Sequence, residues 1–274
     1  GGTLVLQDRW DPSAAVEMIT NRGCSYTLAA TTFLADLVDE CERDGSVLPA
    51  LTHFGCGGAP VPAALVERAD AVGIRVLRLY GSMEVLCATW NRPDSPVEKR
   101  CHTDGPALSH TDLRIEDGEL HVRGPHTSVG FFEDAERTAA TYLPGGWVRS
   151  GDLVEMDSEG YVTVVGRKKE ILIRGGINVA PREIEELIVA FPEVRQAAVV
   201  GVPDARLGER MCACVVLRDG ASLDLTMMTA RLRARGLATY KLPEQIQVVD
   251  QLPATASGKV QKHELLKRIL AERS

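Results

Sequence analysis

One lysine near the C-terminal end of the sequence follows a run of small and polar residues, Pro253-Ala254-Thr255-Ala256-Ser257-Gly258-Lys259. A mobile loop could carry this lysine to a phosphate, where its ammonium group would offset negative charge. The ordinary phosphate loop of NTPases, G-x-x-x-x-G-K-[ST], does not fit. Val260 follows the lysine, and no glycine lies five positions before Gly258. A plain surface turn is the other interpretation, so the rest of the chain must decide.

A second candidate is the glycine-rich run Gly55-Cys56-Gly57-Gly58-Ala59-Pro60, which follows an apolar stretch and precedes a helical pattern over residues 62–72. Glycine has no side chain and tolerates unusual backbone angles, so such a run could admit a flat ring or a phosphate. The run is equally typical of a tight connection between a strand and a helix. By itself it leaves both interpretations open.

A tyrosine, a glycine turn and a carboxylate follow one another in Leu77-Arg78-Leu79-Tyr80-Gly81-Ser82-Met83-Glu84. Parallel α/β sheets present ligands at the carboxyl ends of their strands, where this segment would place Tyr80 and Glu84. Glu84 could hold Mg²⁺ beside a nucleotide phosphate, since hard cations prefer carboxylate oxygen. Alternatively, Glu84 is an acid at the start of a helix, where the helix dipole favours it.

A further carboxylate, Asp152, ends the run Trp147-Val148-Arg149-Ser150-Gly151-Asp152, directly after a Ser-Gly turn. A ribose diol needs an acceptor for two hydrogen bonds, and a carboxylate can supply it. A structural role in the turn is the alternative.

The elements that must position these residues change in character along the chain. Up to about residue 97, short apolar runs such as 3–6 and 26–30 alternate with helical stretches such as 12–20 and 34–41. This alternation is typical of strands and helices in a layered α/β arrangement. Two β-hairpins follow, around Asp117-Gly118 and around Ser158-Glu159-Gly160.

After Gly166 a charged stretch, 167–170, indicates a domain boundary. A helix beginning at Pro181 precedes expected strands at about 197–202, 211–217 and 246–249, with helices near 225–235 and after residue 262. We therefore predict an α/β fold with two domains. Residues 1–166 form a layered domain of sheets, helices and β-hairpins, and residues 167–274 form a small α+β domain.

Composition narrows the classes of partner. The chain has 274 residues and a formal net charge of −7, so it offers no basic face for nucleic acid. No apolar run reaches the roughly 20 residues of a membrane helix and no signal-peptide pattern is present, so we expect a cytoplasmic location. The seven scattered cysteines are expected to be reduced thiols, with Cys212 and Cys214 on one face of a buried strand rather than in a metal site.

Taken in order, these segments resemble the ANL superfamily of adenylate-forming enzymes, which includes acyl-CoA synthetases, peptide-synthetase adenylation domains and luciferases. The resemblance extends over essentially the whole chain. It rests on seven segments in the family's order, at residues 57–60, 80–84, 118–125, 150–152, 166–170, 175–185 and 253–259.

The resemblance implies a nucleotide site in the first domain. The residues that match the family's adenine site are Gly57, Gly58, Ala59 and Pro60, together with Tyr80, Gly81 and Ser82. Glu84 matches the catalytic glutamate associated with magnesium, and Asp152 matches the aspartate that binds the ribose of ATP or AMP. Arg167 matches the arginine near the ribose and phosphate.

In this family a small, mobile C-terminal domain swings between two poses. The first pose forms acyl-AMP and pyrophosphate, and the second passes the acyl group to the thiol of coenzyme A. Lys169 matches the hinge between them, while Gly175 and Gly176 match the loop that approaches the pantetheine tunnel. Lys259 matches the catalytic lysine that reaches the carboxylate and the α-phosphate during adenylation.

Three departures from the family pattern matter. Met83 stands where relatives have a Thr or Ser whose hydroxyl contacts the α-phosphate, and Lys262 replaces a common arginine. The Ser/Thr/Gly-rich loop ending in Pro-Lys-Gly, which grips the β- and γ-phosphates in relatives, does not occur. We therefore expect the chain to be the C-terminal portion of an acyl-CoA synthetase, with an incomplete N-terminal domain and no adenylation activity alone.

The expected partners are coenzyme A and a carboxylic acid, apolar or alicyclic because residues 26–37 contain Leu28, Ala29, Ala30 and Phe33. A partner chain or a homo-oligomer could cover the exposed edge of an incomplete sheet. Two other functions stay open. One is a noncatalytic remnant that binds nucleotide, coenzyme A or a partner, and the other is a stand-alone adenylation domain that loads a carrier protein.

Overall fold

The computed structural model describes residues 1–255 and 259–271. Two compact units divide the chain. The first comprises Gly1–Ser150 and Val154–Val164, and the second comprises Gly151–Leu153 and Val165–Ser274. The division after residue 164 lies two positions before the boundary expected from the sequence.

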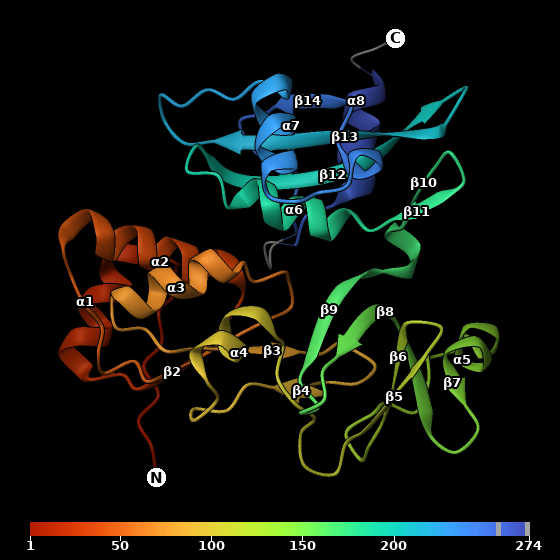
Figure 1. Cartoon of the computed structure of the whole chain (residues 1–274). Coiled ribbons are helices and arrows are strands. Elements are labelled where there is room, and N and C mark those ends of the chain that lie inside the picture. The colour runs from red at the N-terminus through yellow and green to blue at the C-terminus, as the bar shows by residue number, and fades with distance from the viewer. Residues whose placement is uncertain (256–258, 272–274) are drawn as a thin grey trace. The chain divides into compact units, whose positions relative to one another are not determined.

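A four-stranded sheet with strand order β1-β2-β3-β4 organises the N-terminal part of the first unit. Strands β1, β2 and β3 are parallel, and β4 is antiparallel to β3. The strands are β1 (Tyr26–Ala29), β2 (His53–Cys56), β3 (Val76–Tyr80) and β4 (Thr89–Trp90). The helices around them, which Figure 1 shows in red to yellow, are α1 (Pro12–Arg22), α2 (Thr31–Asp44), α3 (Ala63–Ala71) and α4 (Val97–His102).

Alternation along the strands explains how this sheet packs. Phe54 and Cys56 of β2 and Val76 of β3 share a buried core with apolar residues of the four helices. Gly55, between Phe54 and Cys56, belongs to the opposite face of the sheet. The run at 3–6, which was expected to be a strand, contains neither strand nor helix, and this expectation was wrong.

A second sheet has the order β5-β6-β8-β7, with β9 paired to β8, and it belongs to the first unit except for Gly151–Leu153 of β8 and the last three residues of β9. Its elements are β5 (Asp112–Glu116), β6 (Glu119–Arg123), α5 (Ala135–Thr141), β7 (Tyr142–Leu143), β8 (Trp147–Met156) and β9 (Val162–Arg167). The predicted hairpin at Asp117-Gly118 is confirmed, because both residues have positive φ, +50° and +77°, as a tight two-residue turn requires.

The second unit is built on a sheet of order β11-β10-β13-β12, with β14 paired to β13. Its strands are β10 (Leu172–Arg174), β11 (Ile177–Val179), β12 (Val194–Asp204), β13 (Gly208–Leu217) and β14 (Gln245–Val248). The helices are α6 (Pro181–Val189), α7 (Leu225–Ala234) and α8 (Lys262–Ala271), with short 3-10 turns η1 (Lys168–Glu170) and η2 (Thr239–Lys241).

Both faces of this sheet are covered, which explains why β13 reads as a continuous apolar run. Met211 and Ala213 belong to a core with α6 and α7, whereas Cys212 and Cys214 belong to a second core with α8. The prediction that Cys212 and Cys214 share one face of a buried strand is therefore confirmed. A strand buried on both faces loses the apolar–polar alternation of a half-exposed one.

Candidate active site

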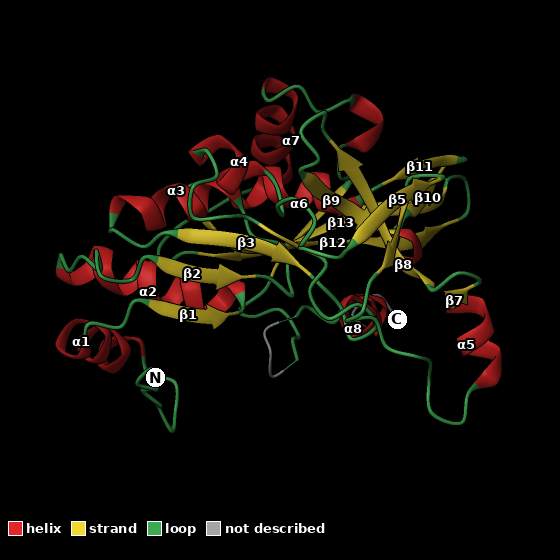
Figure 2. Ribbon diagram, turned by 90° about the horizontal axis from the view of Figure 1, so that it is seen from below, coloured by secondary structure: helices red, strands yellow, loops and turns green. Residues whose placement is uncertain are grey.

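Two of the predicted segments leave the same edge of the parallel sheet. Strands β2 and β3 are parallel neighbours with Cys56 opposite Arg78, so β2 and β3 end side by side. The residues that follow them are Gly57, Gly58, Ala59 and Pro60 after β2, and Gly81, Ser82, Met83 and Glu84 after β3. The structure therefore brings the glycine-rich segment and the Tyr-Gly-Ser-Met-Glu segment to one carboxyl edge, at the arrowheads of β2 and β3 in Figure 2.

Three glycines at this edge are needed for two different reasons. A Cβ at Gly57 would lie 2.6 Å from the carbonyl oxygen of Leu79, and a Cβ at Gly81 would lie 1.8 Å from that of Leu86. Both are backbone contacts that no side-chain rotation could relieve. Gly58 has open space at its Cβ position but a φ of +79°, which other residues rarely adopt. The open backbone at Gly58 fits the close approach of a flat ring or a phosphate.

The first turn of helix α2 holds the glycine-rich loop. Thr31 Oγ1 donates a hydrogen bond to the carbonyl oxygen of Pro60 at 3.1 Å. Beside it, Cys56 is fully buried, and burial raises the pKa of its thiol to about 12. The thiol therefore stays protonated and serves as a small apolar group rather than a nucleophile. Thr31 was not among the predicted site residues, because nothing in its own segment indicates a bond to a carbonyl oxygen 29 positions away.

Glu84 lies in a turn after β3, so the alternative that placed it at the start of a helix was wrong. Ser82 Oγ donates to Glu84 Oε2 at 2.8 Å and accepts from the Glu84 backbone N–H at 3.2 Å. Met83, between them, is 92% exposed. The backbone N–H of Ser128 donates to the Glu84 carbonyl oxygen at 2.8 Å, a contact that sequence reasoning missed because the two residues are 44 positions apart.

Asp152 lies within strand β8, so the alternative that gave it a role in a turn was also wrong. Its neighbours on β8, Val148 and Val154, share a buried core with Tyr80. Asp152 is 4% exposed and accepts a hydrogen bond from Arg167 Nε at 2.6 Å. The structure therefore joins two predicted site residues, Asp152 and Arg167, in an ion pair within the second unit.

The residues on either side of the predicted lysine loop, 253–255 and 259–261, pair with each other and form what we call the loop neck. The Thr255 N–H donates to the Lys259 carbonyl oxygen at 2.9 Å, and the Lys259 N–H donates to Thr255 Oγ1 at 3.2 Å. An antiparallel bridge between Ala254 and Val260 completes the neck. The Lys259 side chain is exposed, while residues 256–258 of the predicted loop lie outside the described residues.

The remaining predicted residues of the second unit occupy turns. Gly175 and Gly176 form the turn between β10 and β11 with φ values of +57° and +81°, and the Gly175 N–H donates to the Leu207 carbonyl oxygen at 2.7 Å. Lys169 is exposed in the middle of η1. The predicted site residues thus fall into two groups, one in each unit.

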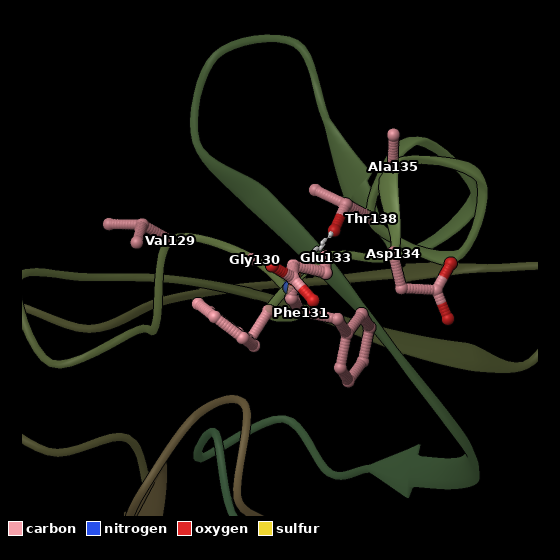
Figure 3. A pocket seen from close by; sticks show the side chains of 8 residues that line it. Val129, Gly130, Phe131, Glu133, Asp134, Ala135 and Thr138 are labelled. Atoms are coloured by element: carbon pink, nitrogen blue, oxygen red, sulfur yellow. Dashed lines mark hydrogen bonds between the residues drawn. The ribbon is translucent and has the colours of Figure 1, made fainter.

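Two hollows in the first unit contain none of the predicted site residues. Residues 129–135 and Thr138 line the first, where the backbone N–H of Phe131 donates to Thr138 Oγ1 at 2.9 Å (Figure 3). The second has a volume of about 410 Å³ and lies against β1, with Trp10, Tyr26 and Phe33 in its wall. Its apolar wall includes part of the segment 26–37.

Within residues 1–255 and 259–271, no three His, Cys, Asp or Glu side chains gather in a way that could hold a metal ion. Mg²⁺ bound with a nucleotide commonly takes only one or two protein carboxylates, so a single Glu84 is compatible with that ion. No described helix combines the length and apolar character needed to cross a bilayer.

Two family models match the chain. The model of the AMP-binding enzyme matches residues 1–132, and the model of the AMP-binding enzyme C-terminal domain matches residues 183–259. They correspond to the first and second units, respectively.

Curated relatives include several acid-activating enzymes. The chain is 38% identical to the medium-chain fatty-acid–CoA ligase of Escherichia coli (strain K12), over 98% of this chain and 50% of the relative. It is also 38% identical to triostin synthetase I of Streptomyces triostinicus, over 97% of this chain and 52% of the relative. The chain thus spans about half the length of the curated relatives it matches.

Solved structures agree with these matches. The amide bond synthetase McbA of Marinactinospora thermotolerans superposes with a TM-score of 0.89 at 32% identity, covering 98% of this chain and 57% of that one. ATP-bound MatB of Rhodopseudomonas palustris superposes with a TM-score of 0.86 at 31% identity, covering 96% of this chain and 54% of that one. With both family models matched in order, the chain belongs to the AMP-binding family of adenylate-forming enzymes, the ANL superfamily.

Proposed function

We propose that this chain is part of an acyl-CoA synthetase, which joins a carboxylic acid to coenzyme A at the expense of ATP. The observation that carries the proposal is the carboxyl edge of the parallel sheet, where Gly58 leaves the backbone open after β2, next to the end of β3 with Tyr80 and the following turn with Glu84. Relatives that are CoA ligases or synthases, such as the feruloyl-CoA synthase of an Amycolatopsis species at 34% identity, support the same assignment.

In the proposed first step, a carboxylate oxygen of the acid attacks the α-phosphorus of ATP, and the bond to the departing pyrophosphate breaks. Gly57, Gly58, Ala59, Pro60, Tyr80, Gly81 and Ser82 would hold the adenine at the sheet edge. Asp152 would accept hydrogen bonds from the ribose. A carboxylate accepts about four hydrogen bonds, so this role is compatible with its ion pair to Arg167.

The remaining proposed roles in adenylation offset the negative charge of the phosphates. Glu84 would help to hold Mg²⁺, which supplies positive charge against the phosphates when it is bound. Lys259 would bring an ammonium group to the place where the acid and the α-phosphate meet. The Lys259 side chain is exposed next to the loop neck, so no buried contact has to break before it reaches the reaction centre. This exposure suits delivery by a moving unit.

In the proposed second step, the thiol sulfur of coenzyme A attacks the acyl carbon, the thiol proton leaves and AMP departs. Lys169 would be the hinge that exchanges the two poses, and it is exposed in a turn of only three residues. Gly175 and Gly176 would approach the pantetheine arm, because their turn carries no side chain that would obstruct it. We also propose an apolar acid, which agrees with the exposed Leu28 and the apolar hollow beside β1.

The proposal is tested by separating the two steps. In the complete polypeptide that carries these residues, Lys259→Ala should lower acid-dependent pyrophosphate release by about a hundredfold or more. It should leave thioester formation from preformed acyl-AMP within about twofold, because the lysine acts only in adenylation. Equal loss of both steps would contradict the role given to Lys259.

The identity of the acceptor distinguishes this proposal from related chemistry. Relatives of the chain include peptide synthetases and an amide bond synthetase as well as CoA ligases. Preformed acyl-AMP offered with coenzyme A, with a phosphopantetheinylated carrier protein or with an amine should give product fastest with coenzyme A. Faster reaction with either other acceptor would replace the CoA assignment, while no reaction with any of them would favour a noncatalytic remnant.

A further inference from the structure

Lys262, the first residue of helix α8, is held between two carboxylates that belong to two other elements. Its Nζ lies 2.8 Å from Glu185 Oε1 and 3.0 Å from Glu170 Oε2. The Lys262 side chain is 23% exposed, that of Glu185 12% and that of Glu170 35%, so the cluster is partly shielded from water. Burial lowers the pKa of Lys262, but the charges of Glu185 and Glu170 outweigh that effect, and its net pKa is raised. The lysine therefore remains charged at neutral pH.

Each carboxylate ties the lysine to a specific part of the second unit. Glu170 is the last residue of η1 and directly follows Lys169, the predicted hinge. Glu185 belongs to α6, and its Oε1 also accepts a hydrogen bond from the Val199 N–H of β12 at 2.7 Å. One ammonium group thus links η1, α6 and α8.

The neck of the Lys259 loop runs directly into this cluster. The Gln261 N–H donates to the Pro253 carbonyl oxygen at 2.8 Å, which closes the base of the loop one residue before Lys262. Farther along α8, Leu265 and Ile269 pack into the core beneath the sheet. Lys262 is therefore the point at which the loop neck joins the rigid body of the unit.

We propose that Lys262 is a positioning residue that fastens the segment after the hinge to the base of the Lys259 loop, so that rotation at Lys169 carries Lys259 as part of one rigid body. The inference rests on the proposed function of Lys259, because only a lysine that must be delivered to a reaction centre needs this link. Without the Lys262 cluster, the hinge segment and the loop would share only the connection through the rest of the unit, and the position of Lys259 after rotation would be less well defined.

The chain supplies a matched control for this cluster. Lys241 also pairs with a carboxylate of α6, since its Nζ lies 2.5 Å from Glu183 Oε2, and its side chain is likewise 23% exposed. The Lys241 ion pair joins η2 to α6, whereas the loop neck is formed by residues 253–255 and 259–261. Lys262→Met and Lys241→Met therefore remove the same kind of ion pair from the same helix, and Lys262→Arg restores a cation.

Hydrogen exchange of the 274-residue chain tests the link without any assay of activity. In Lys262→Met, the amides of Thr255, Lys259 and Gln261 should exchange about tenfold faster, whereas Ala213 in the middle of β13 should be unchanged. Lys241→Met should leave the neck amides as in the parent chain, and Lys262→Arg should keep them within about twofold. Unchanged neck exchange in Lys262→Met would overturn the proposal.

A second measurement connects the link to the reaction. In the complete polypeptide, Lys262→Met should lower pyrophosphate release about tenfold while sparing thioester formation from preformed acyl-AMP, and Lys262→Arg should recover the rate. Full adenylation activity in Lys262→Met would contradict the positioning role. If Lys259→Ala left adenylation intact, the proposed function would fail, but the exchange measurement would still decide whether the link exists.

Lys262→Met could unfold the unit by leaving Glu185 unpaired. Glu170→Ala controls for this outcome, because it removes the carboxylate that links Lys262 to η1 and keeps the bonds of Glu185 to Lys262 and Val199. The same local increase in exchange at the neck is expected, and parent-like exchange in this variant would also overturn the proposal.

Discussion

The carboxyl edge of the parallel sheet and the neck of the Lys259 loop are held in opposite ways. At the sheet edge, Gly57 and Gly81 are enclosed by backbone at distances that leave no room for a side chain. At the neck, a few hydrogen bonds join Thr255 to an otherwise exposed Lys259. The difference indicates that the proposed nucleotide site is formed in advance by crowding, whereas Lys259 is exposed at a neck that a few hydrogen bonds close.

A buried ion pair between Arg78 and Asp104 stabilises the sheet edge. Arg78 of β3 is 3% exposed, and its Nη2 lies 2.8 Å from Asp104 Oδ1. The other oxygen of Asp104 accepts from the Val164 N–H at 3.0 Å, and Arg78 Nη1 donates to the Cys101 carbonyl oxygen at 2.5 Å. This one pair therefore connects the end of β3 with β9 and with α4.

Of the substitutions that test this difference between the sheet edge and the loop neck, removal of the buried Arg78 should change the free energy of unfolding most. Arg78→Met should lower the free energy of unfolding by about 3–5 kcal/mol, because it leaves Asp104 charged and buried without its cation. Urea denaturation would measure the change. Arg68→Met is the control, since Arg68 pairs with Asp39 at the surface, with 30% of its side chain exposed, and should cost about 1 kcal/mol or less. Equal losses of unfolding free energy in the two variants would mean that burial does not account for the strength of the Arg78–Asp104 ion pair.

The crowding at the sheet edge can be tested with methyl groups. Gly81→Ala should cost about 2–3 kcal/mol, because its Cβ would lie 1.8 Å from the Leu86 carbonyl oxygen and the backbone must move. Gly58→Ala should cost only about 1–2 kcal/mol, the strain of a positive φ in open space. The two variants are compared by thermal unfolding. A Gly58 variant as unstable as the Gly81 variant would show that conformation, rather than crowding, dominates this edge.

The smallest effect is expected at the loop neck. Thr255→Val removes the hydroxyl that accepts from the Lys259 N–H and should change the free energy of unfolding by about 1 kcal/mol or less. Exchange of the Lys259 amide should nevertheless become several-fold faster, because its hydrogen-bond acceptor is lost. A loss of stability near that of Arg78→Met would abolish the distinction between the two regions.

Sequence patterns predicted the elements whose signals are local. The hairpin at Asp117-Gly118 was found because two consecutive residues favour positive φ, and the helix starting at Pro181 because proline fits a first helical turn. The run at 3–6 was misread because an apolar segment becomes a strand only where another strand pairs with it. For Glu84 the sequence left open a Mg²⁺ ligand or an acid at the start of a helix, since nothing in its own segment indicates the Ser128 N–H that donates to its carbonyl oxygen.

Short motifs along the chain were enough to indicate the family, the order of the segments and the residue types available for phosphate, ribose and thiol chemistry. Which of these residues share an edge, the pairing of Asp152 with Arg167 and the place of Lys262 between Glu170 and Glu185 came only from the folded chain. Such contacts join residues far apart in the chain, and they depend on strand register and on which charges are removed from water together.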